Sequence, residues 1–317
     1  MVDTVPPPSA QPLLVVVLGA TASGKTNLAV QLTERFSGEI VSCDSVAVYR
    51  ELEIGTAKPS PEQRARVQHH MIDIVSPDQS YTAGDYSRDA RSVLAGIAER
   101  GHVPMIAGGT GLYLRALLEG LFPGPQRLES LRVRLRELET KRGSNYLARI
   151  LRRVDPVSAD MIHPNDTPKL IRAIEVTLAA RQPMSRAWEA GRDPLQGFRI
   201  LRIGLNPPRA ELYARIDRRA AKMFSGGLLE ETEHLLARYG ANCRPLESLG
   251  YKQAAMALRG DLSVDEAISA TQQGHRNYAK RQMTWFRSEA DVYWLQGFGD
   301  SQEIAAQAVA RVDANRN

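Results

Sequence analysis

The sequence is poor in cysteine and has no long apolar run. Its two cysteines, Cys43 and Cys243, lie two hundred residues apart, with no CxxC or Cys/His cluster. That spacing excludes a disulfide framework or zinc module and favours a reducing, cytoplasmic setting. No apolar run approaches the roughly 20 residues of a membrane helix, so no membrane association is predicted. We also expect no signal peptide, because residues 1–12 have three consecutive prolines and no basic start, and we expect a disordered tail there.

Neither positive nor negative residues are in large excess. The 317 residues include 41 Lys+Arg and 36 Asp+Glu, a net charge of +5. This mild excess permits a polyanionic partner without requiring one. With 43% hydrophobic residues, the chain is long enough for one large α/β domain or two smaller ones.

Strand-length apolar runs alternate with helical patterns over the first 120 residues. We expect strands at residues 13–18, 39–43, 70–75 and 103–107, and helices at residues 25–36 and 82–100. The run at 13–18 has no polar alternation, which is typical of a strand buried on both faces. The repeat predicts an α/β fold, a P-loop NTPase-like core with a parallel sheet flanked by helices.

This alternation stops near residue 121 and returns at residue 199. The residues between are Arg-rich, helical in pattern and interrupted by seven prolines. They predict an all-helical insertion, residues 122–198, in a discontinuous core of residues 13–121 and 199–317. Residues 115–202 hold seventeen Lys+Arg against ten Asp+Glu, or +7, which leaves −2 elsewhere. An insertion that grips RNA phosphates explains this charge, and a solvated Arg-rich surface explains it equally well.

A phosphate-binding loop follows the first strand. Residues 19–26 read GATASGKT and fit G-x-x-x-x-G-K-[ST], between a buried strand and an amphipathic helix. In such a loop, backbone N–H groups and the helix dipole face phosphate oxygens, Lys25 adds a cation, and the Thr26 hydroxyl can bind Mg²⁺. The residues expected at the phosphate are Gly19, Thr21, Ala22, Ser23, Gly24, Lys25 and Thr26.

An ATP-using P-loop protein usually has a second apolar strand that ends in a Mg²⁺-binding Asp. Here the candidate strand, residues 103–107, ends in Gly108-Gly109-Thr110 instead. A small-molecule or nucleotide kinase is therefore the weaker alternative. The acid at a strand end is Asp44, where ligands of open α/β sheets bind. A helix cap or a Mg²⁺ ligand is its alternative role.

Seven segments in order resemble the tRNA dimethylallyltransferase (tRNA isopentenyltransferase) family. They are GATASGKT (19–26), DS and VYR within 44–50, IGTAKP (54–59), HHMID (69–73), GGTGLY (108–113), GY (250–251) and AKRQMTWF (279–286). The resemblance implies transfer of a dimethylallyl group from dimethylallyl diphosphate to N6 of adenosine 37 in tRNA, beside the anticodon. Diphosphate is released and Mg²⁺ is the expected cofactor. A second alternative is a P-loop protein that binds RNA and leaves it unmodified.

The resemblance also implies roles for residues. The adenine amine is a poor nucleophile and needs a base, and Asp44 resembles the family's general base. Thr110 matches a position that contacts the adenosine, and Ser45, Val46 and Ala47 fall in a segment lining the same pocket, although many members have Gln where this chain has Ala47.

The P-loop would then hold the diphosphate leaving group. Arg215 and Arg219, four residues apart on one helix face, are expected to clamp it, with Arg219 preferred. The tRNA anticodon stem-loop is the expected partner of a monomer. Its predicted contacts are Pro168, Lys169, Leu170, Ile171, Arg172, Lys280 and Arg281.

Overall fold

The computed structural model describes residues 11–122, 124–125, 127–189 and 191–316. The predicted disordered tail lies outside the described residues except for Gln11 and Pro12. The chain divides into two compact units. Residues 1–118 and 195–317 form the core unit, and residues 119–194 form the helical unit. The helical unit is three or four residues offset from the expected insertion, because the Leu195 amide donates to the Leu118 carbonyl at 2.9 Å within the core unit.

The charge division changes with these boundaries. Residues 119–194 hold fourteen Lys+Arg against ten Asp+Glu, or +4, which leaves +1 for the core unit. Arg115, Arg199 and Arg202, counted earlier with the insertion, belong to the core unit. The helical unit is therefore basic, but less so than the sequence count indicated.

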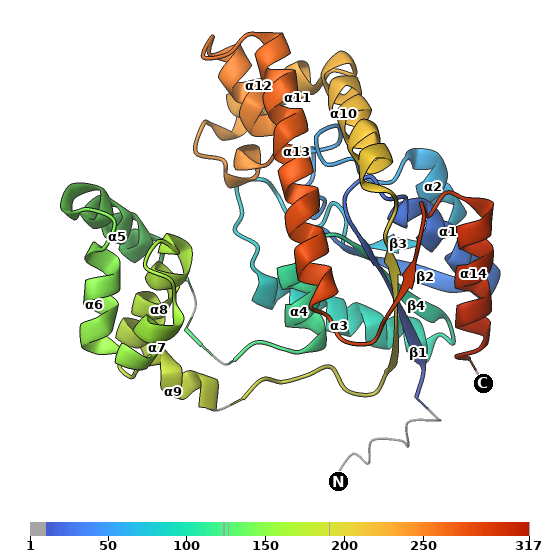
Figure 1. Cartoon of the computed structure of the whole chain (residues 1–317), viewed down its shortest axis with the longest axis horizontal. Helices are drawn as coiled ribbons and strands as arrows, with labels where there is room; N and C mark the ends of the chain where they lie inside the picture. The colour runs from blue at the N-terminus through green and yellow to red at the C-terminus, as the bar shows by residue number, and fades with distance from the viewer. Residues whose placement is uncertain (1–10, 123, 126, 190, 317) are drawn as a thin grey trace. The chain divides into compact units, whose positions relative to one another are not determined.

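The core unit is built on six parallel strands in the order β3-β2-β4-β1-β5-β6 (Figure 1). They are β1 (Leu13–Gly19), β2 (Gly38–Cys43), β3 (His69–His70), β4 (Val103–Gly108), β5 (Arg199–Leu205) and β6 (Val292–Leu295). The parallel α/β fold is thus confirmed. Strand β4 pairs directly with β1, so the Gly108-Gly109-Thr110 turn lies beside the end of the strand that leads into the P-loop.

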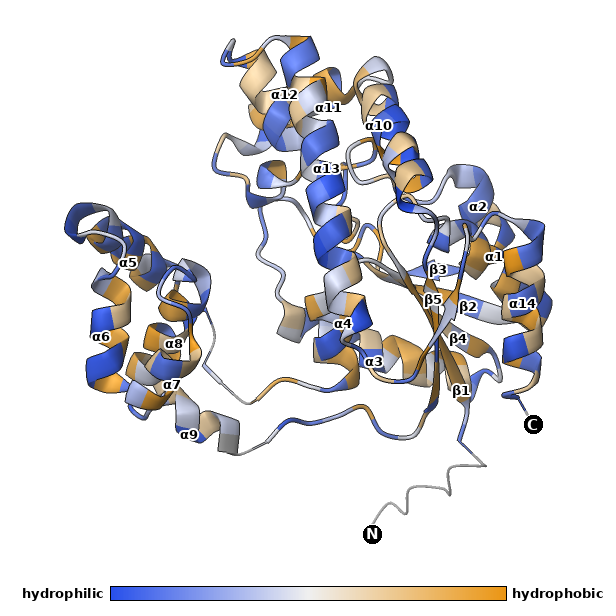
Figure 2. Cartoon of the chain, in the orientation of Figure 1, coloured by the Kyte–Doolittle hydropathy of each residue, from blue (hydrophilic) through white to orange (hydrophobic). Residues whose placement is uncertain are grey.

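Strand β1 is buried along its whole length, as its unbroken apolar sequence predicts. Leu14 and Val16 enter one hydrophobic cluster, whereas Val15 and Val17 enter another. Successive strand side chains point to opposite faces, so each face has its own core. Figure 2 shows the hydrophobic colouring concentrated on these strands.

Helices cover both faces of the sheet. Those of the core unit are α1 (Lys25–Phe36), α2 (Pro61–Arg66), α3 (Ala83–Glu99), α4 (Gly111–Leu118), α10 (Arg209–Ser225), α11 (Leu228–Tyr239), the 3-10 helix η2 (Arg244–Glu247), α12 (Tyr251–Leu258), α13 (Val264–Arg287) and α14 (Gln302–Asp313). Helices α1 and α14 contribute to the cluster that contains Val15, and α3 and α4 to the cluster that contains Leu14. In Figure 1 these two pairs flank the sheet.

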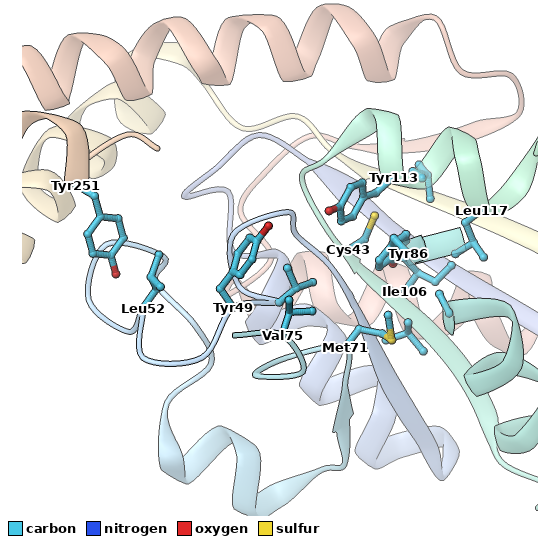
Figure 3. Close-up of a cluster of buried hydrophobic side chains, with 14 of the residues drawn as sticks. Cys43, Tyr49, Leu52, Met71, Val75, Tyr86, Ile106, Tyr113, Leu117 and Tyr251 are labelled. Carbon is cyan, nitrogen blue, oxygen red and sulfur yellow. The ribbon is translucent and has the colours of Figure 1, made fainter. Parts of the chain in front are cut away.

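The cluster around Cys43 supports the carboxyl end of β2, from which Asp44 extends. Tyr86 stacks on Tyr113 with ring centroids 4.4 Å apart, and its hydroxyl donates to the Ser42 carbonyl at 3.0 Å. Figure 3 shows Cys43, Tyr86 and Tyr113 gathered at this point. Cys43 is buried in this cluster as a core residue, and burial raises the pKa of its thiol to about 12.

The expected strand at residues 70–75 is wrong in extent. Strand β3 contains His69 and His70 alone, because Met71 and Asp73 adopt positive φ angles of 62° and 58° that end the extended backbone. Beyond this break, Val75 forms an isolated parallel β-bridge with Tyr49. Strand β6 and helices α2 and α14 were not predicted.

The helical unit consists of α5 (Glu129–Arg142), α6 (Tyr146–Val154), α7 (Pro156–Met161), α8 (Thr167–Ala180) and α9 (Met184–Glu189). Its apolar core includes Leu147, Leu151 and Leu170. The fully buried Glu175 carboxylate accepts hydrogen bonds from Arg132 and Arg172, which hold its pKa down to about 2.

Candidate active site

The P-loop turns tightly between β1 and α1. Gly24 has a φ of 88°, in the region that favours glycine, and helix α1 begins at the next residue. The Gly299 amide donates to the Ser23 carbonyl at 2.9 Å. A Cβ on Gly24 would lie 2.8 Å from the Gly299 nitrogen, so glycine is also required by this contact. The loop after β6 therefore supports the P-loop from behind.

A cavity of about 440 Å³ opens in front of the P-loop. Nine residues predicted for the site line it: Thr21, Ala22, Gly24, Lys25, Thr26, Asp44, Ala47, Arg215 and Arg219. Gly108, Gly109, Tyr278 and Gln282 line it as well. The structure thus brings the phosphate loop, the strand-end carboxylate and the Gly-rich turn to one place.

Two cations of this cavity are held in a poorly solvated position. Lys25 Nζ donates to the Ala20 carbonyl at 2.7 Å, and burial, assisted by the Arg219 charge, lowers the Lys25 pKa to about 7. Burial likewise lowers the pKa of Arg219, which donates to the Thr21 hydroxyl at 2.5 Å. Asp44 is the one carboxylate among the described lining residues. Such a site favours a ligand with several negative charges.

Arg215 is placed differently from Arg219. Its guanidinium pairs with the Asp300 carboxylate at 2.7 Å and lies 3.6 Å from the centroid of the Phe298 ring. These contacts hold Arg215 toward the loop after β6, although it still lines the cavity. Of the two predicted clamps, Arg219 is the one whose guanidinium is bonded to the P-loop.

Asp44 uses one carboxylate oxygen to shape its own turn. Oδ1 accepts hydrogen bonds from the Val46 and Ala47 amides at 2.8 and 3.1 Å. Asp44 therefore caps a turn and not a helix, because residues 45–48 form a turn and the next helix begins at Pro61. Oδ2 has no hydrogen-bond partner among the described residues. This oxygen is therefore available to a ligand in the cavity.

Thr110 joins the two strand ends. Its hydroxyl accepts from the Ser45 amide at 3.0 Å, while its own amide donates to the Cys43 carbonyl at 3.1 Å. The turn after β4 is thereby fixed against the turn after β2. Ala47 is buried and lines the cavity, and Ser45 and Val46 are half-buried beside it.

Replacing Gly108 with alanine tests how closely these turns must approach. A Cβ at Gly108 would lie 2.1 Å from the Cys43 carbonyl oxygen, so we expect the unfolding free energy to fall by about 1–3 kcal/mol. Activity should fall as well, because the two turns that line the cavity would be pushed apart. Gly84→Ala is the control, because its Cβ would meet an ordinary 3.6 Å contact in the first turn of α3. Urea unfolding measures the stability of both variants. Equal stability of the two variants would contradict the close approach.

Gln282 was not predicted as a site residue, yet it connects the two halves of the site. Its Oε1 accepts from the Thr21 amide at 2.8 Å, and its Nε2 donates to the Gly109 carbonyl at 2.8 Å. Tyr278, one turn earlier on α13, donates to the same carbonyl at 3.3 Å. Gln282 lies in a segment that resembles the family, but the sequence does not reveal which face of the helix meets the P-loop.

The expected RNA-contact residues are only partly accessible. The side chains of Leu170 and Ile171 are buried in the core of the helical unit, which leaves only their backbone for an RNA contact, and the predicted contact of this segment stays a prediction. Arg172 is held by Glu175 at 2.6 Å, whereas Pro168 and Lys169 are exposed, with Lys169 paired to Asp166. In the core unit, Lys280 and Arg281 are exposed on α13.

Two kinds of feature were sought across the described part of the chain. No helix there combines the length and apolar character required to cross a membrane. Nor does any group of three or more His, Cys, Asp or Glu side chains have an arrangement suited to hold a metal ion.

Comparison with known proteins gives one consistent result. The family profile described as IPP transferase matches residues 47–289. A tRNA dimethylallyltransferase from Koribacter versatilis is 62% identical over 95% of this chain and 98% of its own, and one from Solibacter usitatus is 51% identical over 94% and 97%. The crystal structure of the tRNA isopentenylpyrophosphate transferase from Bacillus halodurans superposes with a TM-score of 0.71 at 34% identity, covering 96% of this chain and 97% of its own.

Proposed function

The chain belongs to the IPP transferase family, and on that premise we propose how its cavity transfers a dimethylallyl group from dimethylallyl diphosphate to N6 of adenosine 37 in tRNA. One observation carries the assignment of roles. A phosphate loop with two poorly solvated cations shares a cavity with the Asp44 carboxylate, one of whose oxygens has no hydrogen-bond partner in the described part of the chain. The first part suits the diphosphate and the second suits the amine that replaces it.

The diphosphate end is assigned to the P-loop. As the allylic C–O bond breaks, its electron pair goes to the diphosphate oxygen, and negative charge grows there. Lys25, Arg219 and the amides at the start of α1 stabilise that charge at the end of the cavity formed by the P-loop. Arg215 supports the rim through Asp300 and adds to the positive field.

Asp44 is assigned as the general base. The N6 amine forms the new bond to the allylic carbon, and its proton passes to Oδ2, the oxygen that the turn does not use. Thr110, at the adjoining turn, is assigned to orient the adenine. The Ala47 side chain carries no hydrogen-bonding group into the cavity, so the adenine depends on neighbouring groups for polar contacts.

Mg²⁺ is the proposed cofactor, and the residues that line the cavity would supply only part of its coordination. Thr26 lines the cavity and offers a hydroxyl oxygen as a ligand, while Oδ2 of Asp44 is assigned to the N6 proton. Mg²⁺ usually keeps several waters and binds through one or two protein groups plus substrate phosphates. When bound, it would neutralise charge on the departing diphosphate.

The helical unit is the proposed grip on the tRNA backbone. Its +4 charge includes exposed basic residues on α5 and α6, and Lys169 is exposed at the start of α8. Adenosine 37 must leave its stack to reach a cavity, at modest cost for an unpaired base. We propose a monomer that acts in the cytoplasm.

Replacing Lys169 with alanine should weaken tRNA binding without affecting dimethylallyl diphosphate. Loss of one phosphate contact is expected to reduce the slope of log affinity against log salt by about one. Arg311→Ala, at an exposed position of α14, is the matched control. Filter binding over a salt series measures both. A slope that stayed at the wild-type value would exclude Lys169 from the interface.

The kinase alternative is not favoured. Strand β4 lies next to β1, where the Mg²⁺-binding acid of an ATP-using protein is expected, and it ends in glycine. The decisive experiment incubates the protein with unmodified tRNA bearing A36-A37, labelled dimethylallyl diphosphate and Mg²⁺. Digestion should yield N6-isopentenyladenosine. Intact tRNA binding without that product would refute the transferase assignment and favour a non-catalytic RNA-binding protein.

A further inference from the structure

A buried histidine on α13 contacts the arginine that faces the P-loop. His275 is 7% exposed, and its Nδ1 lies 3.3 Å from Nη2 of Arg219. The same Nη2 donates to the Thr21 hydroxyl. One guanidinium nitrogen is therefore held between the P-loop on one side and the imidazole on the other.

The chemistry of this contact fixes the state of the imidazole. A guanidinium can only donate, so His275 Nδ1 must accept and its ring proton must sit on Nε2. Burial and the nearby Arg219 charge lower the His275 pKa to about 4, so the ring is neutral at pH 7. A protonated ring could not accept this hydrogen bond.

Arg219 has few other partners. Its Nε is buried and has no hydrogen-bond partner among the described residues, and Nε2 of His275 is in the same condition. Arginine has a long side chain with many rotamers, so its direction depends on these two contacts. Without them, the cation could turn away from the cavity it lines.

We propose that His275 is a positioning residue: its neutral imidazole holds the Arg219 guanidinium in the direction of a diphosphate bound at the P-loop. The proposal rests on the assignment of the diphosphate to this loop. A cation fixed before the reaction avoids reorganisation as charge develops, which is the source of much electrostatic catalysis. His275 itself is not among the residues that line the cavity.

The junction between α10 and α13 does not depend on His275 alone. Arg276 pairs with Asp217 at 2.5 Å, and Gln272 donates to the Asp217 carbonyl at 3.2 Å. Both contacts join the same two helices. A substitution at His275 should therefore change the direction of Arg219 while the helices stay together.

Two substitutions separate the hydrogen bond from the packing. His275→Leu fills similar space without an acceptor, whereas His275→Asn can place its amide oxygen near the position of Nδ1. For His275→Leu we expect about tenfold weaker binding of inorganic diphosphate and a similar fall in kcat, as for loss of one charge-assisted hydrogen bond. The tRNA affinity should not change. His275→Asn should recover most of both losses.

A double-mutant cycle shows whether the effect passes through Arg219. In an Arg219→Ala background, His275→Leu should cause no further loss of diphosphate affinity. Thr271→Val, at another buried position of α13, controls for packing and should bind diphosphate like the wild type. Equal losses from His275→Leu in both backgrounds, or an Asn variant as impaired as the Leu variant, would overturn the proposal.

Calorimetry of inorganic diphosphate needs no turnover, so the two proposals can fail separately. A wild-type protein that bound diphosphate and formed no isopentenyladenosine would refute the proposed function. The affinities of the His275 variants would still decide the role of this residue.

Discussion

Replacing Asp44 with asparagine is expected to lower kcat by about 10²–10⁴-fold, the usual contribution of a general base. The amide is nearly the same size, and its oxygen can still accept from the Val46 and Ala47 amides as Oδ1 does. It cannot take the proton from N6. Because the turn is preserved, tRNA affinity should be almost unchanged. Single-turnover kinetics with saturating dimethylallyl diphosphate measures the chemical step directly.

Asp44→Ala gives the contrast that interprets this result. Alanine removes both the base and the turn cap, so it should lower kcat similarly and also cost about 1 kcal/mol of stability, as loss of a cap does. If asparagine retained wild-type turnover and only alanine failed, Asp44 would be a turn-forming residue. A collapse of tRNA affinity in the asparagine variant would instead make it a binding residue.

The parts of the site that the sequence predicts are those that local chain geometry determines. The P-loop follows from a buried strand, a Gly-rich turn and an amphipathic helix within residues 13–36. Asp44 follows from its place at the end of a strand, since the carboxyl ends of parallel strands share one edge of the sheet. In both cases the neighbours that matter are close in sequence.

Contacts between distant segments were not predictable in this way. Gln282 meets Thr21 across 261 residues, and Asp300 meets Arg215 across 85. Each depends on how a helix or loop from the end of the chain packs on the P-loop. That loop lies between strand β6, which has only four residues, and helix α14, and neither element carries a motif.

The family resemblance identified segments of the chain, but it did not show which side chains of a segment are exposed. Residues 168–172 begin helix α8, so Leu170 and Ile171 turn into the core while Lys169 remains exposed. A matched run of residues does not state which of them point outward. The strand expected at residues 70–75 failed for a related reason, because the positive φ angles of Met71 and Asp73 are set by the surrounding structure.

Replacing Lys25 with methionine should nearly abolish turnover and, at the same time, stabilise the ligand-free protein. Loss of a cation at the leaving group is expected to cost about 10²–10³-fold in kcat. The stability effect has the opposite sign. The Lys25 pKa falls from its ordinary 10.5 to about 7 in the native protein, so between these values the unfolded chain binds a proton that the native state does not. Native stability therefore rises with pH from about 7 to about 10.5, and the penalty for burying the charge is complete below pH 7.

Methionine removes this penalty because it fills the same space without a charge. We expect a higher Tm than the wild type at pH 6, a smaller difference at pH 9, and no further rise in Tm when inorganic diphosphate is added. Lys252→Met, at an exposed position of α12, should show none of these changes. A Lys25→Met protein less stable than the wild type at pH 6 would mean that the Lys25 charge is already compensated without a ligand. The cavity would then lack the uncompensated positive charge on which its preference for a diphosphate depends.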